Sequence, residues 1–214
     1  MDLWTSLEAA RNRWNVLEHP FYQRWSDGTL SRQELATYSV QYREAVIGLA
    51  EATTAAAAAA SGDDAAVLDG HAAEEQAHVA IWDEFATSMG ANFQDELTEE
   101  TKQCRTTWAG ESRDGVLEHL VAMYAIESAQ PEISKTKLTG LVERYDVTDP
   151  AALRYFALHA ERDIEHAAEG KELIQRNFAG ADLERLTEIA EDVYRSNWEL
   201  LDGVDRVLGV NDRN

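Results

Sequence analysis

Two histidines and an aspartate recur at helical spacing in the segment YFALHAERDIEHAAEGKEL, which begins at Tyr155. His159, Asp163 and His166 are separated by four and then three residues. Each residue of an α-helix turns the chain by about 100°, so these three side chains fall within an arc of about 60° on one face. Imidazole and carboxylate groups together suit iron or manganese. We therefore predict that this stripe binds a metal.

A buried acid is predicted on another helix. Glu127 shares a helical face with Leu117, Leu120, Met123 and Tyr124. An unpaired buried carboxylate costs several kcal/mol, so it needs a cation, a hydrogen-bond network or a proton. We expect Glu127 to face the histidine–aspartate stripe across the core.

The segment HAAEEQAHVAIW, which begins at His71, offers further ligands. Glu75 and His78 form an E-x-x-H pair, the arrangement found in carboxylate-bridged di-iron bundles. Glu74 and His71 lie four and seven residues before His78 and flank the same stripe. The pattern predicts His78 and Glu75 as ligands, with Glu74 and His71 as alternatives for the acid.

The preceding helix carries two more acids, Glu44 and Glu51, seven residues apart on one face. It should form an antiparallel hairpin with the next helix about residues 61–64. Either acid could then reach the layer of Glu75 and His78. We predict Glu44 as a ligand and keep Glu51 as the alternative.

These residues must be positioned by helices, because few segments alternate in the manner of a strand and only three prolines interrupt the chain. Helices are expected at about residues 3–18, 31–60, 64–89, a short segment near 104, 112–145 with an interruption at Pro131, 150–177 and 182–208. The prediction is an all-α bundle of seven helices in a single domain, 1–214. His19, before Pro20, is expected to be structural, and His119 to be solvated.

Composition excludes several classes of protein. The formal net charge is −21, so the chain is a poor ligand for nucleic acid or an anionic membrane. Apolar runs stay shorter than the about 20 residues of a membrane span, and the start has no signal-peptide pattern. A single cysteine, Cys104, fits a reducing compartment. We expect a cytoplasmic protein that binds neither nucleic acid nor membrane.

Longer segments resemble a known family. The segment HPFYQRWSDGTLSRQELATYSVQYREAV resembles the opening of the thiaminase II and pyrroloquinoline quinone synthase superfamily, whose fold is the seven-helix haem-oxygenase-like bundle. HVAIWDEFATSMG, ESAQPEISKTKLTGLVERY and YFALHAERDIEHA are similar to one branch, the haem-oxygenase-like di-iron oxidases and oxygenases. The similarity covers nearly the whole chain.

The resemblance implies two Fe(II) ions per chain, with manganese as an alternative. The ligands that it implies are His78, Glu127, His159, Asp163 and His166, with Glu75 and Glu44 as the further acids. Some members of the branch place an acid seven residues before the histidine, where this chain has His71, and others place it three before, where it has Glu75. The acid of the preceding helix is not fixed by the motif, so Glu51 stays open.

The function implied is O₂-dependent oxidation of a small amine, an amino-acid-like compound or a carboxylic acid, by N-oxygenation or oxidative C–C cleavage. One subgroup converts its own tyrosine into 4-aminobenzoate and uses a lysine ten residues after the acid equivalent to Glu127. Lys137 stands at that offset. Alternatives are a metal-free oxidase like pyrroloquinoline quinone synthase, a thiaminase-II-like hydrolase, and a non-catalytic helical binding protein. A homodimer is expected, since related folds often pair across a two-fold axis.

Overall fold

The computed structural model describes residues 2–110 and 112–210, and within them the regular structure is entirely helical. The elements are α1 (Leu3–Arg13), a 3₁₀ turn η1 (Val16–Glu18), α2 (Pro20–Asp27), α3 (Arg32–Ala59), α4 (Asp63–Met89), α5 (Glu99–Ala109), α6 (Gly115–Glu127), α7 (Gln130–Arg144), α8 (Pro150–Asn177) and α9 (Leu183–Val207). The predicted all-α bundle is confirmed. The predicted number of seven helices is wrong, because the described residues form nine.

Two expected helices are divided. The first ends at Arg13, and the side chain of Asn15 begins the 3₁₀ turn by accepting a hydrogen bond from the Leu17 amide at 3.2 Å. His19 then caps α2, since its Nδ1 accepts from the Phe21 amide at 3.0 Å, and Pro20 occupies the first helical position. The structural role predicted for His19 is therefore confirmed.

The second division lies between α6 and α7. Ser128 and Ala129 keep right-handed helical dihedral angles but leave the regular helix, and α7 starts at Gln130 with Pro131 in its first turn. Proline has no amide hydrogen to donate, so it fits the first turn of a new helix better than the interior of a continuous one.

Local signals explain the long hairpin of α3 and α4. Ser31 and Glu34 form the predicted capping box, with bonds of 3.2 Å from the Glu34 amide to Ser31 and 2.7 Å from the Ser31 amide to Glu34. The alanine run extends α3 to Ala59, as the high helix propensity of alanine predicts. Gly62, at φ 62°, adopts the backbone conformation that starts α4.

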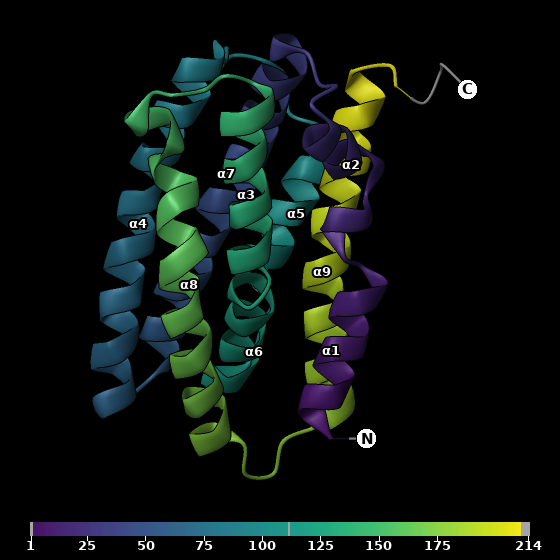
Figure 1. Cartoon of the computed structure of the whole chain (residues 1–214). Coiled ribbons are helices and arrows are strands. Elements are labelled where there is room, and N and C mark those ends of the chain that lie inside the picture. Colours follow the sequence, from purple (N-terminus) through teal and green to yellow (C-terminus); the bar gives the residue numbers. More distant parts are fainter. Residues whose placement is uncertain (1, 111, 211–214) are drawn as a thin grey trace.

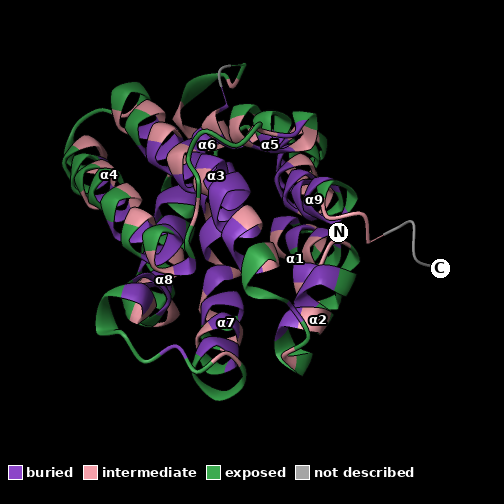
Figure 2. Cartoon of the chain, turned by 90° about the horizontal axis from the view of Figure 1, so that it is seen from above, coloured by how far each residue is buried: buried purple, intermediate pink, exposed green. Residues whose placement is uncertain are grey.

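Helices α4, α6 and α8 enclose one part of the core. α8 packs against α4, α6 and α7, while α3 packs against α4, α5 and α6 (Figure 1). α9 lies beside α1, α5 and α6. Seen along the bundle, the buried faces of α3, α4, α6 and α8 turn toward the interior (Figure 2). Side chains from α4, α6 and α8 can therefore converge.

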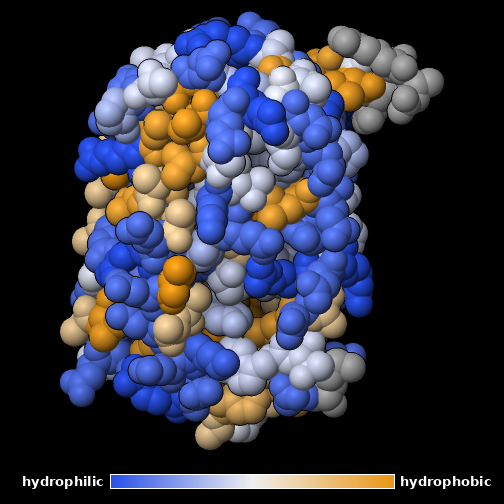
Figure 3. All heavy atoms as spheres, in the orientation of Figure 1, coloured by the Kyte–Doolittle hydropathy of each residue, from blue (hydrophilic) through white to orange (hydrophobic). Residues whose placement is uncertain are grey.

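The outer surface is mainly hydrophilic on the face that Figure 3 shows, with smaller apolar areas between the polar side chains. Large apolar residues that are at least a third exposed are few, and Ile164 on α8 is the most exposed of those described, at 61%. Among the described residues, none of the helices is both long enough and apolar enough to cross a bilayer.

Candidate metal centre

The histidine–aspartate stripe of α8 turns into the core, as its spacing predicts. His159 and His166 are 0% exposed and Asp163 is 1% exposed. Glu161 and Glu165, on the same helix, are exposed. The helix therefore separates its ligand-type side chains from its solvated ones.

Glu75 of α4 joins this stripe to His78. One group of ligand atoms within 4.8 Å of one another comes from Glu75, His78 and His159, and a second comes from Glu75, Asp163 and His166. Glu75 Oε1 lies 3.0 Å from His78 Nδ1, and its Oε2 lies 3.9 Å from His159 Nε2. Glu75 Oε1 is also 3.9 Å from His166 Nδ1. One carboxylate thus belongs to both groups of ligand-type atoms.

Glu127, at the last position of α6, approaches from the third helix. It is 1% exposed, and its Oε1 lies 3.9 Å from His166 Nδ1. Burial raises the pKa of Glu127 well above its ordinary value, and the neighbouring carboxylates of Asp163 and Glu75 raise it further. The acid is therefore held where its charged form needs a cation. Below, the ligand cluster means these six residues: Glu75, His78, Glu127, His159, Asp163 and His166.

The ligand cluster is short of hydrogen-bond partners. Within the part of the chain that the structure describes, buried atoms without a partner include both carboxylate oxygens of Glu75, both of Asp163, Glu127 Oε1, His78 Nδ1, His159 Nε2 and His166 Nδ1. The 3.0 Å approach of His78 to Glu75 lacks hydrogen-bond geometry. Buried polar atoms normally have a hydrogen-bond partner, so eight such atoms without one in the same place indicate that a further group binds there. Carboxylate oxygens and imidazole nitrogens are donors that fit a metal ion such as iron or manganese.

Neighbouring groups orient the two α8 imidazoles. His159 Nδ1 donates to the Tyr155 carbonyl at 2.8 Å, which leaves the Nε2 lone pair for the cluster. His166 Nε2 lies 3.2 Å from Glu74 Oε2, which leaves Nδ1 for the cluster. Arg162 holds that carboxylate with two bonds of 2.9 Å. Such second-layer partners fix the tautomer of a metal-binding histidine.

The pKa shifts show opposing influences in this small volume. Burial alone would raise the pKa of Glu75, yet the imidazoles of His159 and His78 lower it to about 2. Burial would lower the pKa of His159 and of His166, yet the carboxylates of Glu75 and Asp163 raise both. Burial is the main reason that the pKa of Asp163 is raised. Positive charge is therefore favoured at the centre of the cluster.

The structure corrects the prediction for α3. Glu44 lies outside both ligand groups, and Arg105 of α5 holds it through a 2.7 Å bond to Oε2. The same guanidinium holds Glu51 with bonds of 3.1 and 2.5 Å. Both acids line an open surface pocket. The expected hairpin of α3 and α4 is present, but the spacing within α3 could not predict the rotation of that helix or the contact with Arg105.

The alternatives on α4 lie outside the two ligand groups. Glu74 contacts Nε2 of His166, as described above, and is half-buried. His71 is buried, with Nε2 2.7 Å from Glu169 and its ring centroid 4.4 Å from that of His166. His119 was expected to be solvated, but it is 7% exposed, so that prediction is wrong. Of the acids considered on α4, Glu75 is the one that enters the ligand groups.

A second buried polar region surrounds Lys137, whose burial the sequence analysis did not predict. Lys137 is 1% exposed, and its Nζ lies 4.2, 5.1 and 5.5 Å from the ring centroids of Tyr42, Tyr22 and Tyr38. Burial lowers the pKa of Lys137 well below its ordinary value, so the amine tends to be neutral. We call these four residues the lysine–tyrosine cluster.

Packing of α2 against α7 positions the lysine. The indole Nε1 of Trp25 donates to the Lys137 carbonyl at 3.2 Å. A Cβ at Gly140 would lie 2.6 Å from the Trp25 ring, so only glycine permits this approach. The tyrosines are linked as well, since the hydroxyls of Tyr22 and Tyr38 lie 2.8 Å apart. Two signals in the sequence could have indicated this region, the i, i+4 spacing of Tyr38 and Tyr42 and the offset of ten residues between Glu127 and Lys137.

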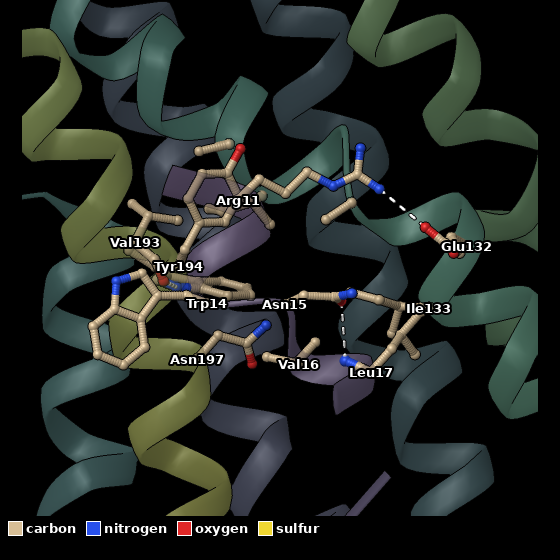
Figure 4. Close-up of a pocket in the computed structure, with 14 residues that line it drawn as sticks. Arg11, Trp14, Asn15, Val16, Leu17, Glu132, Ile133, Val193, Tyr194 and Asn197 are labelled. Atoms are coloured by element: carbon tan, nitrogen blue, oxygen red, sulfur yellow. Dashed lines mark hydrogen bonds and ion pairs between the residues drawn. The ribbon is translucent and has the colours of Figure 1, made fainter. Parts of the chain in front are cut away.

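A small cavity lies elsewhere, between α1, η1, α5, α6, α7 and α9 (Figure 4). Its volume is about 20 Å³, which suits about one water molecule. Trp14, Tyr194 and Asn197 line it, and Arg11 reaches across it to Glu132 at 3.1 Å. The residues that line it include none of the ligand cluster, so it is not the candidate metal centre.

Fold and site together define a haem-oxygenase-like helical bundle with a buried carboxylate–histidine cluster that could bind metal. The sequence profile of the TENA/THI-4/PQQC family matches residues 7–204, and the chain belongs to this family. The predicted superfamily is thereby confirmed.

Two relatives with a named activity are similar to this chain over most of its length. A 4-aminobenzoate synthase of Nitrosomonas europaea is 31% identical over 218 residues, which cover 89% of this chain and 85% of the relative. A 4-aminobenzoate synthase of Chlamydia muridarum is 28% identical over 212 residues, 94% of this chain and 89% of that protein. These similarities support an enzyme at the level of the family.

Solved structures support the fold. A domain of unknown function with a heme oxygenase-like fold from Shewanella denitrificans superposes with a TM-score of 0.82 at 17% identity, over 100% of this chain and 96% of that one. A TenA homologue from Pseudomonas syringae also gives 0.82, at 19% identity, over 95% and 91% of the two chains. At such identities the likeness concerns the fold alone.

Proposed function

We propose that this protein is an O₂-dependent non-haem iron oxidase whose ligand cluster holds two Fe(II) ions. The observation that carries the proposal is the group of eight orphaned oxygen and nitrogen atoms on three helices. Iron bound there would supply the electrons and the Lewis acidity that O₂ activation requires. Manganese suits the same donors and is the alternative metal.

The surrounding residues would prepare the site. Glu75 would bridge, since it belongs to both ligand groups. Tyr155 and Glu74 would keep His159 and His166 in the tautomers that turn a lone pair inward. The buried rings of Tyr155 and Trp82 would exclude water from the reaction.

We further propose that the product is 4-aminobenzoate, formed from a tyrosine of the chain itself. The names of the relatives and the lysine–tyrosine cluster support this reading. An aryl amine needs a nitrogen source, and a neutral amine lies over the rings of Tyr22, Tyr38 and Tyr42. In this proposal Lys137 provides the amine and one of the three tyrosines provides the ring.

The rival functions fit the structure less well. A thiaminase-like hydrolase needs a reactive thiolate, but Cys104 is buried and its pKa is raised to about 12. A metal-free oxidase would leave the orphaned atoms of the ligand cluster without a purpose. A non-catalytic binding protein would bear the cost of a buried lysine without using it.

The test begins with anaerobic loading with Fe(II). Elemental analysis should then show about two iron ions per chain, and exposure to O₂ should consume the gas. Mass spectrometry should show a modified tyrosine residue in the chain, together with released 4-aminobenzoate. The protein could instead take up O₂ only when an external amine, amino acid or carboxylic acid is added, while the chain stays unmodified. That result would support the oxidase but reject a tyrosine of the chain as the source of the product. Absence of both iron and O₂ uptake would reject the oxidase.

The homodimer stays a prediction, which light scattering would test.

A further inference from the structure

The open pocket that Glu44 and Glu51 line also collects cations, although the chain is strongly acidic. We call it the α5 pocket; it lies between α3, α5 and the start of α6, and its volume is about 670 Å³. Lys102, Arg105 and Arg113 line it, three of the 19 basic residues in a chain that has 40 acidic ones. Sites for small molecules usually measure about 300–1,000 Å³. The α5 pocket therefore has the size of a binding site and a local excess of positive groups.

Two of these cations already have carboxylate partners. Arg105 holds the two acids of α3, as described above. The Nζ of Lys102 lies 2.6 Å from Oε1 of the exposed Glu99. The positive charge that is available to a ligand is therefore that of Arg113.

Arg113 is half-buried, and its recorded hydrogen bonds go to backbone carbonyls. Among the described residues, its two Nη atoms donate to Thr107 and Trp108 at the end of α5. Burial lowers the pKa of Arg113 to about 10, so the side chain stays charged at neutral pH although it has lost part of its hydration. A guanidinium has five N–H donors, and the two carbonyl bonds use only two of them. An anion in the pocket would therefore find both charge and free donors.

His119 of α6 gives a second, independent indication of a ligand. It lines the α5 pocket and is 7% exposed, and its Nδ1 is buried without a hydrogen-bond partner among the described residues. Burial lowers the pKa of His119, and the charge of Arg113 lowers it further, so the ring is neutral at pH 7. Capping of α5 would explain the carbonyl bonds of Arg113, but it gives no partner to this imidazole.

The other walls of the pocket limit the kind of anion. Ala55, Leu97 and Ala109 contribute apolar surface, which an inorganic ion would leave uncovered and a short apolar body would cover. The acids Glu44 and Glu51 stand in the same pocket, so a ligand with two negative charges would be repelled more strongly than one with a single charge. These features favour a singly charged organic anion.

We propose that the α5 pocket binds a small organic carboxylate. Its carboxylate would accept hydrogen bonds from Arg113 and His119, and its apolar body would lie against Ala55, Leu97 and Ala109. Carboxylates fit the planar fork of a guanidinium. The residues that line the pocket include none of the ligand cluster and none of the lysine–tyrosine cluster. The inference therefore goes beyond the proposed oxidase and does not depend on iron.

Benzoate is the probe, and the metal-free full chain is used so that the carboxylate cannot bind to iron. Isothermal titration calorimetry compares benzoate with benzyl alcohol, which has the same ring without a charge, and with phenyl phosphate, which carries a second charge. Nuclear magnetic resonance of histidine-labelled protein then locates the site. Benzoate should move the signal of His119, identified by its absence from His119→Phe, and leave those of His71 and His166 in place.

The decisive variant is Arg113→Gln. It should weaken the binding of benzoate by about tenfold, the effect of losing one charge-assisted hydrogen bond. The matched control is Arg144→Gln, the same change at an arginine that lines a different open pocket, and it should bind benzoate as the parent does. Because Arg113 also holds the end of α5, circular dichroism checks the fold. If Arg113→Gln does not fold, His119→Phe decides, and it should show a similar loss.

Four results would each overturn the proposal. They are a parent that neither binds benzoate nor shifts the signal of His119, equal binding of benzyl alcohol, tighter binding of phenyl phosphate, and parent-like affinity for benzoate in the folded Arg113→Gln or, in its place, His119→Phe. An equal loss in Arg144→Gln would also count against the site, because it would show that benzoate responds to the overall charge of the chain. Failure of the protein to bind iron would concern the proposed oxidase alone.

Discussion

The ligand cluster and the lysine–tyrosine cluster are both buried and polar, but burial acts on them in opposite ways. Burial raises the pKa of Glu127, and it lowers the pKa of Lys137. In each case the neutral form is favoured, as desolvation requires. The difference lies in the neighbours. The acids face imidazoles and orphaned oxygens, whereas the amine faces aromatic rings.

This contrast separates two kinds of site. A cation entering the ligand cluster would satisfy many lone pairs at once, so the arrangement favours metal binding. A cation in the lysine–tyrosine cluster would be the ammonium itself, and ring faces compensate its desolvation only in part. The first region is therefore suited to holding charge, and the second to keeping an amine neutral and nucleophilic.

The largest expected effect comes from removing a ligand. Asp163→Ala should lose at least one iron ion per chain and most O₂ uptake, while circular dichroism stays helical. His166→Ala should behave in the same way. Glu165→Ala is the control, because Glu165 is exposed and pairs with Arg162. Parent-like iron content in Asp163→Ala, measured by elemental analysis, would contradict the metal centre.

Lys137→Met should abolish 4-aminobenzoate while the iron content stays that of the parent. Methionine has a similar length and is apolar, so the metal-free variant should also be more stable at neutral pH, by on the order of 1 kcal/mol. Mass spectrometry and elemental analysis separate the two results. Product formed at the parent's rate would remove Lys137 from the reaction.

The difference in unfolding free energy between the Lys137→Met variant and the parent should depend on pH in a defined direction. The native pKa of Lys137 is lowered, while the unfolded chain keeps a value near 10.5. Between these values the unfolded state binds one more proton, so the stability of the parent rises with pH, by at most about 1.4 kcal/mol per unit. The advantage of the variant should therefore shrink between pH 7 and pH 9 in urea unfolding of the metal-free proteins. A constant difference would mean that the amine is not kept neutral.

A smaller effect is expected when a residue that holds a predicted ligand in place is changed. Glu74→Ala removes the carboxylate that orients His166, so iron affinity should fall by about 10-fold to 100-fold without loss of the fold. Glu169→Ala is the companion variant, because Glu169 holds His71 rather than a member of the ligand cluster. Titration with Fe(II) compares the two. An equal loss in Glu169→Ala would show that His71 contributes to the site.

The smallest effect is expected from Glu44→Gln. Glu44 pairs with Arg105, which is 38% exposed, so the change should cost less than about 1 kcal/mol in unfolding free energy. Iron content should remain that of the parent. Loss of iron from this variant would restore Glu44 to the ligand set and contradict the structure on this point.

The sequence by itself predicted the helical class and most residues of the ligand cluster. Spacing of four and three on α8 placed His159, Asp163 and His166 on one buried stripe, because helical geometry is local. The apolar face around Glu127 and the E-x-x-H pair of Glu75 and His78 could be predicted for the same reason. The long helices were delimited by local signals, such as the capping box at Ser31.

Only the tertiary structure decided which faces meet. Glu44 and Glu51 had the right spacing, but the rotation of α3 turns them toward Arg105 of α5 and away from the ligand cluster. The burial of Lys137 among tyrosines from α2 and α3 depends on the approach of Trp25 to Gly140, a contact between residues 115 positions apart. Spacing within one helix is set by the backbone, whereas contacts between helices depend on packing that no single segment encodes.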